Sequence, residues 1–365
     1  MSSNASWSAL VLSGDGHELV ITSNGIICVS TNLGLTFMPT TGIGSVFATS
    51  SNGLSILSVS GANLYVSTNR GATWTTNTTP ATFVQFAASS DARVIAASDG
   101  RLGVYVSTNF AQSWNSNVLS DPISGGYYIS RSTTYSLACS ADGSHIYGAA
   151  TTSVELNSYG WIFGSTNFGA TWNVYDQSGG FVLSVACSSG GTIVFYSQYG
   201  YAGGQVSTNS GTSWSGYGVQ GQGNIACSAD GKVAVLNTVS TGYGIGVSPN
   251  MGTTWYAANC PIQQGDVMSS ADGNTLVASS YGAIYISKPP PNLPVSFASS
   301  FTSSNGVPTF VVAGQPGYSY MVETSSDLIN WTTIASLINT NGTVPFTDPA
   351  GMNYTQRFYR VVVGP

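Results

Sequence analysis

Short apolar stretches alternate with polar turns along the first 290 residues, and no helical periodicity competes with them. In one cycle, apolar residues 83–88 precede a turn at Asp91, two further apolar stretches span residues 94–97 and 103–106, and a polar stretch follows Trp114. Turns with Asp-Gly or Asn-Gly between apolar stretches are typical of β-hairpins, because glycine adopts positive φ without a steric clash. Each cycle therefore predicts four antiparallel strands.

A recurring eight-residue phrase, Ser-Thr-Asn-x-Gly-x-Thr-Trp, stands after the third predicted strand, and we call it the box. Its six near-complete copies begin at Ser30, Ser67, Ser107, Ser165, Ser207 and Ser248, and a decayed seventh begins at Ser287. Repeats of about 40 residues are typical of propeller blades. Seven upstream turns match the seven boxes, so we predict an all-β chain: a seven-bladed β-propeller followed by a small β-sandwich domain.

The domain boundaries follow from the end of this repeat. We expect residues 1–287 to form the propeller, residues 288–297 to form a proline-rich, extended linker, and residues 298–365 to form the β-sandwich. The seventh blade lacks an outer strand, because the prolines after Ser287 cannot donate to a ladder. We expect residues 4–7 to supply that strand and close the ring.

The box resembles the Asp-box, or bacterial neuraminidase repeat, whose pattern is Ser/Thr-x-Asp-x-Gly-x-Thr-Trp. Here asparagine stands at the Asp position, as at Asn69, which keeps the side-chain acceptor of the turn and removes its charge. The resemblance implies a sialidase-like propeller in which the box is a folding device. Sialidases need an arginine triad, for which the propeller offers only Arg70, Arg93, Arg101 and Arg131, with Arg70 inside a box. Sialidase activity is not expected, because the Arg-Ile-Pro opening of sialidases is also absent before the first box.

The C-terminal residues 320–331 resemble the small β-domains that end many large secreted bacterial proteins. That resemblance implies an extracellular or cell-surface location, although the sequence has no signal peptide at its N-terminus.

Charge is scarce, because only 6% of residues are Asp, Glu, Lys or Arg, against roughly 25% in soluble domains. A net charge of -6 with eight basic residues leaves no basic stripe, so we expect no nucleic-acid partner. The sequence contains no apolar run of about 18 residues, so we expect no membrane insertion. The five cysteines lack a Cys-x-x-Cys motif and only two histidines are present, so we expect neither a metal nor a cofactor.

Aromatic residues gather in loops that the propeller topology places on the face opposite the boxes. Aromatic rings beside amides and hydroxyls suit sugars, whose CH faces stack on rings while their hydroxyls need donors and acceptors. The predicted ligand-binding residues are Tyr127, Tyr128, Tyr159, Trp161, Tyr199, Tyr201, Tyr243 and Tyr281. In the alternative interpretation these tyrosines only edge the sheets, since β-rich chains favour tyrosine.

These features favour a non-catalytic extracellular protein that binds a glycan or another surface polymer. A second hypothesis is a self-assembling structural or fibre protein, a homo-oligomer or filament, because a nearly uncharged surface and an incomplete blade protect poorly against association. A third is a polysaccharide-cleaving glycoside hydrolase, which needs two carboxylates about 5–9 Å apart. Its weak candidates are Glu155, Asp176 and Asp266.

Overall fold

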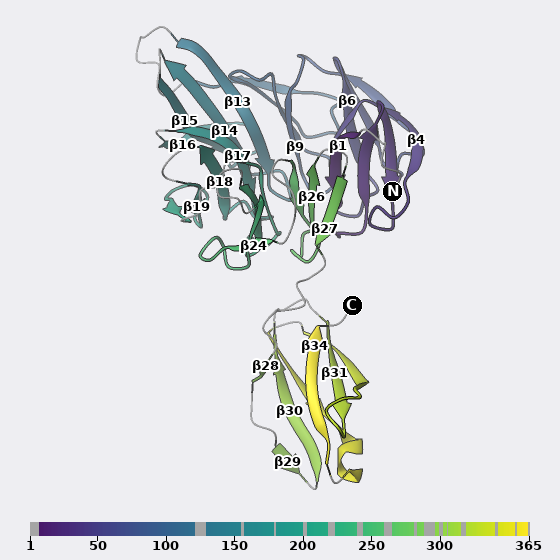
Figure 1. The fold of residues 1–365 in the computed structure, drawn as a ribbon. Helices are drawn as coiled ribbons and strands as arrows, with labels where there is room; N and C mark the ends of the chain where they lie inside the picture. The colour runs from purple at the N-terminus through teal and green to yellow at the C-terminus, as the bar shows by residue number, and fades with distance from the viewer. Residues whose placement is uncertain are drawn as a thin grey trace. The chain divides into compact units, whose positions relative to one another are not determined.

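The structure is a computed structural model of the 365-residue chain. It describes residues 7–120, 129–154, 157–178, 180–199, 203–217, 223–238, 244–258, 265–280, 283–287, 296–298, 302–304, 306–314, 319–339, 342–354 and 356–363. The chain divides into two compact units, Met1–Ser287 and Lys288–Pro365. Each unit is built from β-strands (Figure 1).

The described residues of the first unit form seven antiparallel sheets, which we call blades one to seven in chain order. Blade one contains β1 (Trp7–Leu12), β2 (Leu19–Ser23), β3 (Ile26–Ser30) and β4 (Met38–Ile43). Blade two contains β5 (Ser45–Thr49), β6 (Ile56–Ser60), β7 (Asn63–Ser67) and β8 (Thr75–Thr78). Blade three contains β9 (Gln85–Ala88), β10 (Ile95–Ser98), β11 (Gly103–Ser107) and β12 (Asn115–Val118), close to the predicted cycle.

The remaining blades continue the same strand order. Blade four contains β13 (Ile129–Cys139), β14 (Ile146–Val154), β15 (Asn157–Ser165) and β16 (Asn173–Ser178). Blade five contains β17 (Phe181–Cys187), β18 (Val194–Tyr199), β19 (Gln205–Ser207) and β20 (Ser215–Gly216). Blade six contains β21 (Ile225–Cys227), β22 (Ala234–Thr238), β23 (Gly244–Ser248) and β24 (Tyr256–Ala258), and blade seven contains β25 (Val267–Ser269), β26 (Leu276–Ser280) and β27 (Ala283–Ser287).

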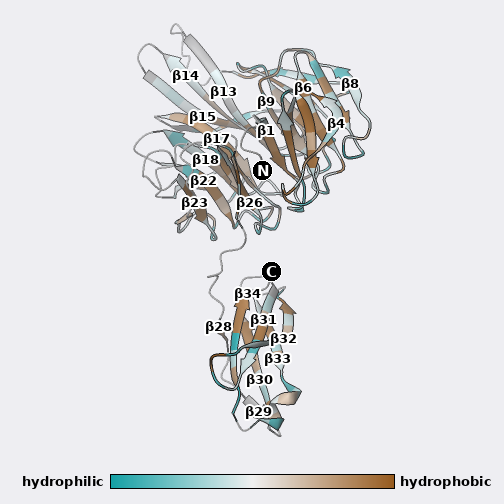
Figure 2. Ribbon diagram, turned by 45° about the vertical axis from the view of Figure 1, so that its right-hand side comes forward, coloured by the Kyte–Doolittle hydropathy of each residue, from teal (hydrophilic) through white to brown (hydrophobic). Residues whose placement is uncertain are grey.

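Apolar side chains fill the space between successive blades, because alternate residues of each strand point to opposite sides of its sheet. Leu57 of blade two packs with Ile95 of blade three, for example, and Val235 of blade six packs with Val267 of blade seven. Leu19 of blade one packs with Val277 of blade seven, which closes the ring. Figure 2 shows hydrophobic colour on inner strands such as β6 and hydrophilic colour on the outer strand β8.

A closed circuit of backbone hydrogen bonds joins the turns between the first and second strands of all seven blades. The bonds run from Ser51 N to Ser90 O (2.6 Å), Ser90 N to Ala141 O (2.9 Å), Ala141 N to Ser189 O (2.9 Å), Ser189 N to Ala229 O (2.8 Å), Ala229 N to Ala271 O (2.7 Å), Ala271 N to Gly14 O (2.6 Å) and Asp15 N to Ser51 O (2.8 Å). These turns therefore meet around one centre.

Each of the six near-complete boxes folds into a turn that its own side chains hold. In the second copy, Ser67 Oγ accepts from Gly71 N (2.8 Å), Asn69 Oδ1 accepts from Thr73 N (2.8 Å), and Trp74 Nε1 donates to Gly71 O (3.0 Å). The backbone of Arg70 also donates to Leu54 O (2.9 Å) in the adjacent turn. The boxes and the circuit of turns thus lie at the same end of the blades, which we call the turn face.

The N-terminal strand differs from the prediction. Trp7 pairs with Ser23 and opens the first strand of blade one, so it does not complete blade seven. Trp7 continues the apolar pattern of residues 9–12, which explains why it belongs to this strand and not to blade seven. Residues 4–6 lie outside the described residues, and blade seven has three strands among those that the structure describes.

The described cysteines are partly buried and pack against the apolar clusters between blades. Cys139, Cys187 and Cys227 are unpaired, and burial raises the pKa of the Cys139 and Cys227 thiols to about 12 and that of Cys187 well above its usual value. Such pKa values keep these thiols protonated at neutral pH, and a protonated thiol is a poor nucleophile. Cys260 lies outside the described residues.

The second unit consists of two small sheets over a shared apolar core. One sheet contains β28 (Ser296–Phe297), β30 (Val307–Ala313), β29 (Thr302–Ser304) and β33 (Thr343–Thr347), and the other contains β32 (Thr332–Ile338), β31 (Ser319–Ser325) and β34 (Phe358–Val363). A 3₁₀ helix, η1, spans Pro349–Asn353. Phe310 and Val312 of the first sheet pack with Tyr320 and Val322 of the second.

If the box is a folding device, its asparagine contributes through the acceptor Oδ1. We expect Asn69→Ala to lower the free energy of unfolding by about 1–2 kcal/mol, because Thr73 N–H and Ser67 Oγ–H lose their acceptor. Asn69→Asp keeps that acceptor and should change stability by less than half as much. Urea unfolding measures both, and equal losses in the two variants would contradict this role.

Candidate functional site

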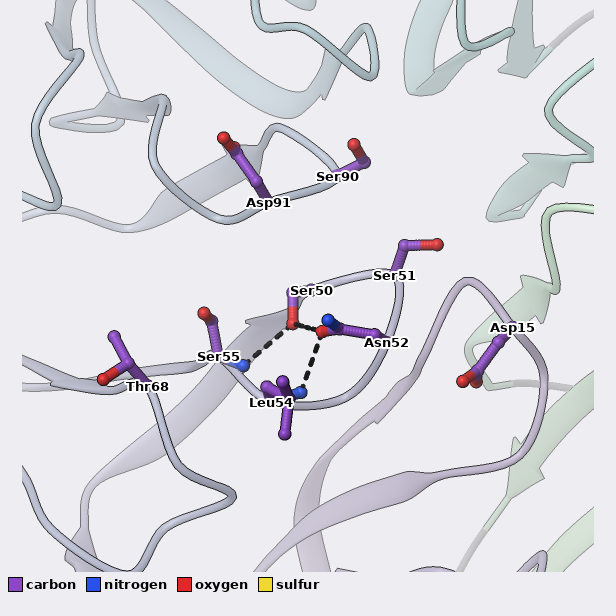
Figure 3. Close-up of a pocket in the computed structure, with 9 residues that line it drawn as sticks. All are labelled: Asp15, Ser50, Ser51, Asn52, Leu54, Ser55, Thr68, Ser90 and Asp91. Atoms are coloured by element: carbon purple, nitrogen blue, oxygen red, sulfur yellow. Dashed lines mark hydrogen bonds between the residues drawn. The ribbon is translucent and has the colours of Figure 1, made fainter.

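The turn face carries a hollow of about 420 Å³ among blades one to three (Figure 3). Eight of its nine lining residues are of polar types, and the nine are Asp15, Ser50, Ser51, Asn52, Leu54, Ser55, Thr68, Ser90 and Asp91. The carboxylates of this hollow serve their own turns. Asp91 accepts from Ser89 Oγ (2.6 Å) and Arg93 N (3.0 Å), and Arg93 Nε lies 3.4 Å from its second oxygen.

Burial alone would raise the pKa of Asp91, but these hydrogen bonds and the Arg93 charge lower it below its usual value. Hydrogen bonds from Ser140 and Ser144 likewise lower the pKa of Asp142, in the equivalent turn of blade four, to about 2. The turn-face aspartates are therefore anionic acceptors that hold hairpins, and we do not assign them a chemical role.

The opposite end of the blades, which we call the loop face, carries the loops between second and third strands. Blade four reaches furthest along its strands: β13 has 11 residues and β14 and β15 have nine each, against at most seven in the other described strands of the first unit (Figure 1). Tyr159 lies on β15 in this added length, opposite Thr152 of β14, and is 37% exposed.

The prediction for Trp161 is wrong, because this side chain is completely buried. It packs with Val104 and Leu119 of blade three, and its Nε1 donates to Thr152 Oγ1 (3.1 Å). Tyr159 is two residues earlier on the same strand, so it points to the same side, toward blade three. The predicted aromatic group is thus divided between two sides of the face.

An exposed aromatic pair stands on blade five. Phe181 and Tyr199 are directly opposite each other in β17 and β18, and they are 40% and 55% exposed. Ser197, two residues before Tyr199, donates from Oγ to Gly223 O (2.6 Å) at the start of blade six. Alternation therefore directs Tyr199 toward blade six. Phe181 is not among the ligand-binding residues predicted from the sequence.

Polar groups at the same end of the blades link blades six and seven. Asn224 Nδ2 donates to Asp266 Oδ1 (2.6 Å), and both side chains are exposed. Asn237 is buried on β22 and holds both loops. Its backbone N–H donates to the Asn224 carbonyl (3.0 Å), and its Nδ2 donates to Gly265 O (2.9 Å). We call Phe181, Tyr199, Asn224 and Asp266 the loop-face site.

The two candidate carboxylates that the structure describes, Asp176 and Asp266, do not pair with each other. Asp176 lies on the outer strand of blade four and accepts from Tyr196 Oη of blade five (2.5 Å). Burial and this hydrogen bond raise the pKa of Tyr196. Asp266 opens blade seven, so blades five and six stand between the two carboxylates.

Several predicted residues lie outside the described part of the chain: Tyr127, Tyr128, Glu155, Tyr201, Tyr243 and Tyr281. Among the residues that the structure describes, no cluster of His, Cys, Asp or Glu could hold a metal ion. No helix within that part is long and apolar enough to cross a membrane.

Comparison with solved structures identifies the architecture. The chain is similar to a hydrazine synthase structure from Kuenenia stuttgartiensis (TM-score 0.55, 12% identity, covering 79% of this chain and 98% of that one). It is also similar to the Cps50 (Swd1) β-propeller domain of Myceliophteria thermophila (TM-score 0.57, 12% identity, 79% and 98% covered). The fold is a β-propeller.

At such low identity the likeness extends to the propeller fold alone. No family model matches the sequence, and no curated protein is significantly similar to it.

The contrast between Trp161 and Tyr159 can be measured. We expect Trp161→Ala to lower the free energy of unfolding by about 3–5 kcal/mol, because a large buried side chain leaves a cavity. Tyr159→Ala, on the same side of the same strand, should cost less than about 1 kcal/mol, since its ring is partly exposed. Comparable losses in urea unfolding would contradict the assignment of Trp161 to the core.

Proposed function

We propose that the propeller binds a glycan or another surface polymer, without cleaving it, at the loop-face site. The exposed Phe181–Tyr199 pair carries this proposal. Adjacent rings on paired strands offer an apolar platform, and the CH face of a sugar stacks on such a platform. Removing this apolar area from water favours binding.

The surroundings of the pair suit a ligand rich in hydroxyl groups. The Asn224 side chain is exposed and presents an amide, which can both donate and accept. Its position is fixed, because Ile225 N donates to Ser184 Oγ (3.3 Å) and Asn224 Nδ2 is held by Asp266. A fixed polar group loses little entropy when it binds, which supports specific recognition.

Binding without cleavage is the simplest interpretation of the acids. Glycosidases need two carboxylates on either side of the bond. Asp176 instead accepts from Tyr196 and Asp266 accepts from Asn224, and blades five and six lie between these two acids. Sialidase activity is not proposed.

We also infer that the box is an asparagine variant of the Asp-box, on the strength of its sequence and its side-chain hydrogen bonds. An extracellular or cell-surface location is proposed from the resemblance of the C-terminal unit to the small domains of secreted proteins.

A glycan array followed by affinity measurements tests the proposal. We expect the wild-type protein to bind at least one polysaccharide, and Tyr199→Ala and Phe181→Ala each to weaken that binding at least tenfold, about 1.4 kcal/mol. Tyr256→Ala is the matched control, because Tyr256 is exposed on the outer strand β24 next to a box. Binding that survives both loop-face substitutions, or no binding at all, would refute the proposal.

Self-assembly is a second candidate, favoured by apolar residues on the rim of blade one. Leu35 and Met38 are 79% and 71% exposed, whereas the equivalent positions of the second box are Ala72 and Thr75. We expect the wild-type protein to form concentration-dependent oligomers in sedimentation velocity and the double variant Leu35→Ser/Met38→Ser to remain monomeric. A wild-type protein that stays monomeric at high concentration would exclude this candidate.

A further inference from the structure

Blades five to seven carry one charged residue that does not belong to a turn. Residues 179–287 contain four charged residues, which are Asp230, Lys232, Asp266 and Asp272. Three of them lie on the turn face: Ser228 and Ser270 donate to Asp230 and Asp272, and Lys232 Nζ is 3.2 Å from Asp230. Asp266 alone lies at the other end, just before β25.

The position of Asp266 is well defined. Its carboxylate accepts from Asn224 Nδ2 (2.6 Å), and the backbone of the preceding residue, Gly265, accepts from the buried Asn237 (2.9 Å). Its own carbonyl accepts from Ser279 N (2.9 Å) of β26. Three contacts from two blades thus hold an exposed negative charge within the loop-face site.

We propose that Asp266 sets the charge specificity of the loop-face site, so that it accepts uncharged glycans and rejects polymers with carboxylate, sulfate or phosphate groups. This inference rests on the proposed glycan-binding function. An anionic group placed here would face the Asp266 carboxylate, and the repulsion between like charges disfavours its binding. Lys232 is the sole basic residue of residues 179–287, and it is paired on the opposite face, so no cation of these blades offsets the repulsion.

The alternative is that Asp266 acts only as the hydrogen-bond acceptor that positions Asn224. Asparagine at position 266 keeps an oxygen acceptor for the Asn224 amide while it removes the charge. The substitution Asp266→Asn therefore separates the two roles, because in the alternative it would leave charge discrimination unchanged.

The experiment uses the full chain and two forms of one ligand: the neutral polysaccharide found on the array and the same polysaccharide after carboxymethylation. We expect the wild-type protein to bind the carboxymethylated form at least about tenfold more weakly, and Asp266→Asn to reduce this ratio to about twofold. The wild-type ratio should also fall when the salt concentration is raised from 0.02 to 0.5 M, because salt screens exposed charges.

Asp272→Asn is the matched control. It removes an acid from the turn face, and Asn52 fills the equivalent position in the turn of blade two, so the ratio should stay at the wild-type value. A ratio that Asp266→Asn leaves unchanged, or a wild-type preference for anionic glycans, would overturn the inference while the glycan-binding function stands. Failure of the wild-type protein to bind any polysaccharide would refute the function itself, and this inference with it.

Discussion

The closed circuit of turn-to-turn hydrogen bonds is the constraint on which the propeller depends. Neighbouring backbones approach to hydrogen-bond distance at every step, including the step from Ala271 back to Gly14. The residues at this position of the repeat are Gly14, Ser51, Ser90, Ala141, Ser189, Ala229 and Ala271, all of them small. A Cβ on Gly14 would lie 2.5 Å from Ser51 Oγ, which shows how little room a larger side chain would have.

The two ends of the blades also differ in what their polar side chains do. On the turn face, serine, aspartate and asparagine side chains are used to hold hairpins and boxes, so that acids such as Asp91 are acceptors for their own turns. The circuit of hydrogen bonds does not constrain the loop face, and the lengths of its loops and strands vary between blades. The exposed aromatic pair and the isolated Asp266 both lie there.

The repeated features were predictable from the sequence because each is a local rule that recurs. The box and the turn specify hydrogen bonds within eight residues, and alternation gives strands such as β9 to β12 close to their predicted bounds. Trp161 could not be placed in this way. Its burial depends on Val104 and Leu119 of another blade and on the unusual length of β15. Phe181 is the opposite case: it belongs to an apolar stretch of the sequence, but in the structure it is 40% exposed and lies opposite Tyr199.

The central claim, that a polymer lies across the Phe181–Tyr199 pair, can be tested by hydrogen–deuterium exchange with and without the polysaccharide selected on the array. We expect slower exchange in β17, in the end of β18 and around Gly223 and Asn224, with the turns of the circuit unchanged. Protection confined to the turn face, or no protection at saturating polysaccharide, would contradict it.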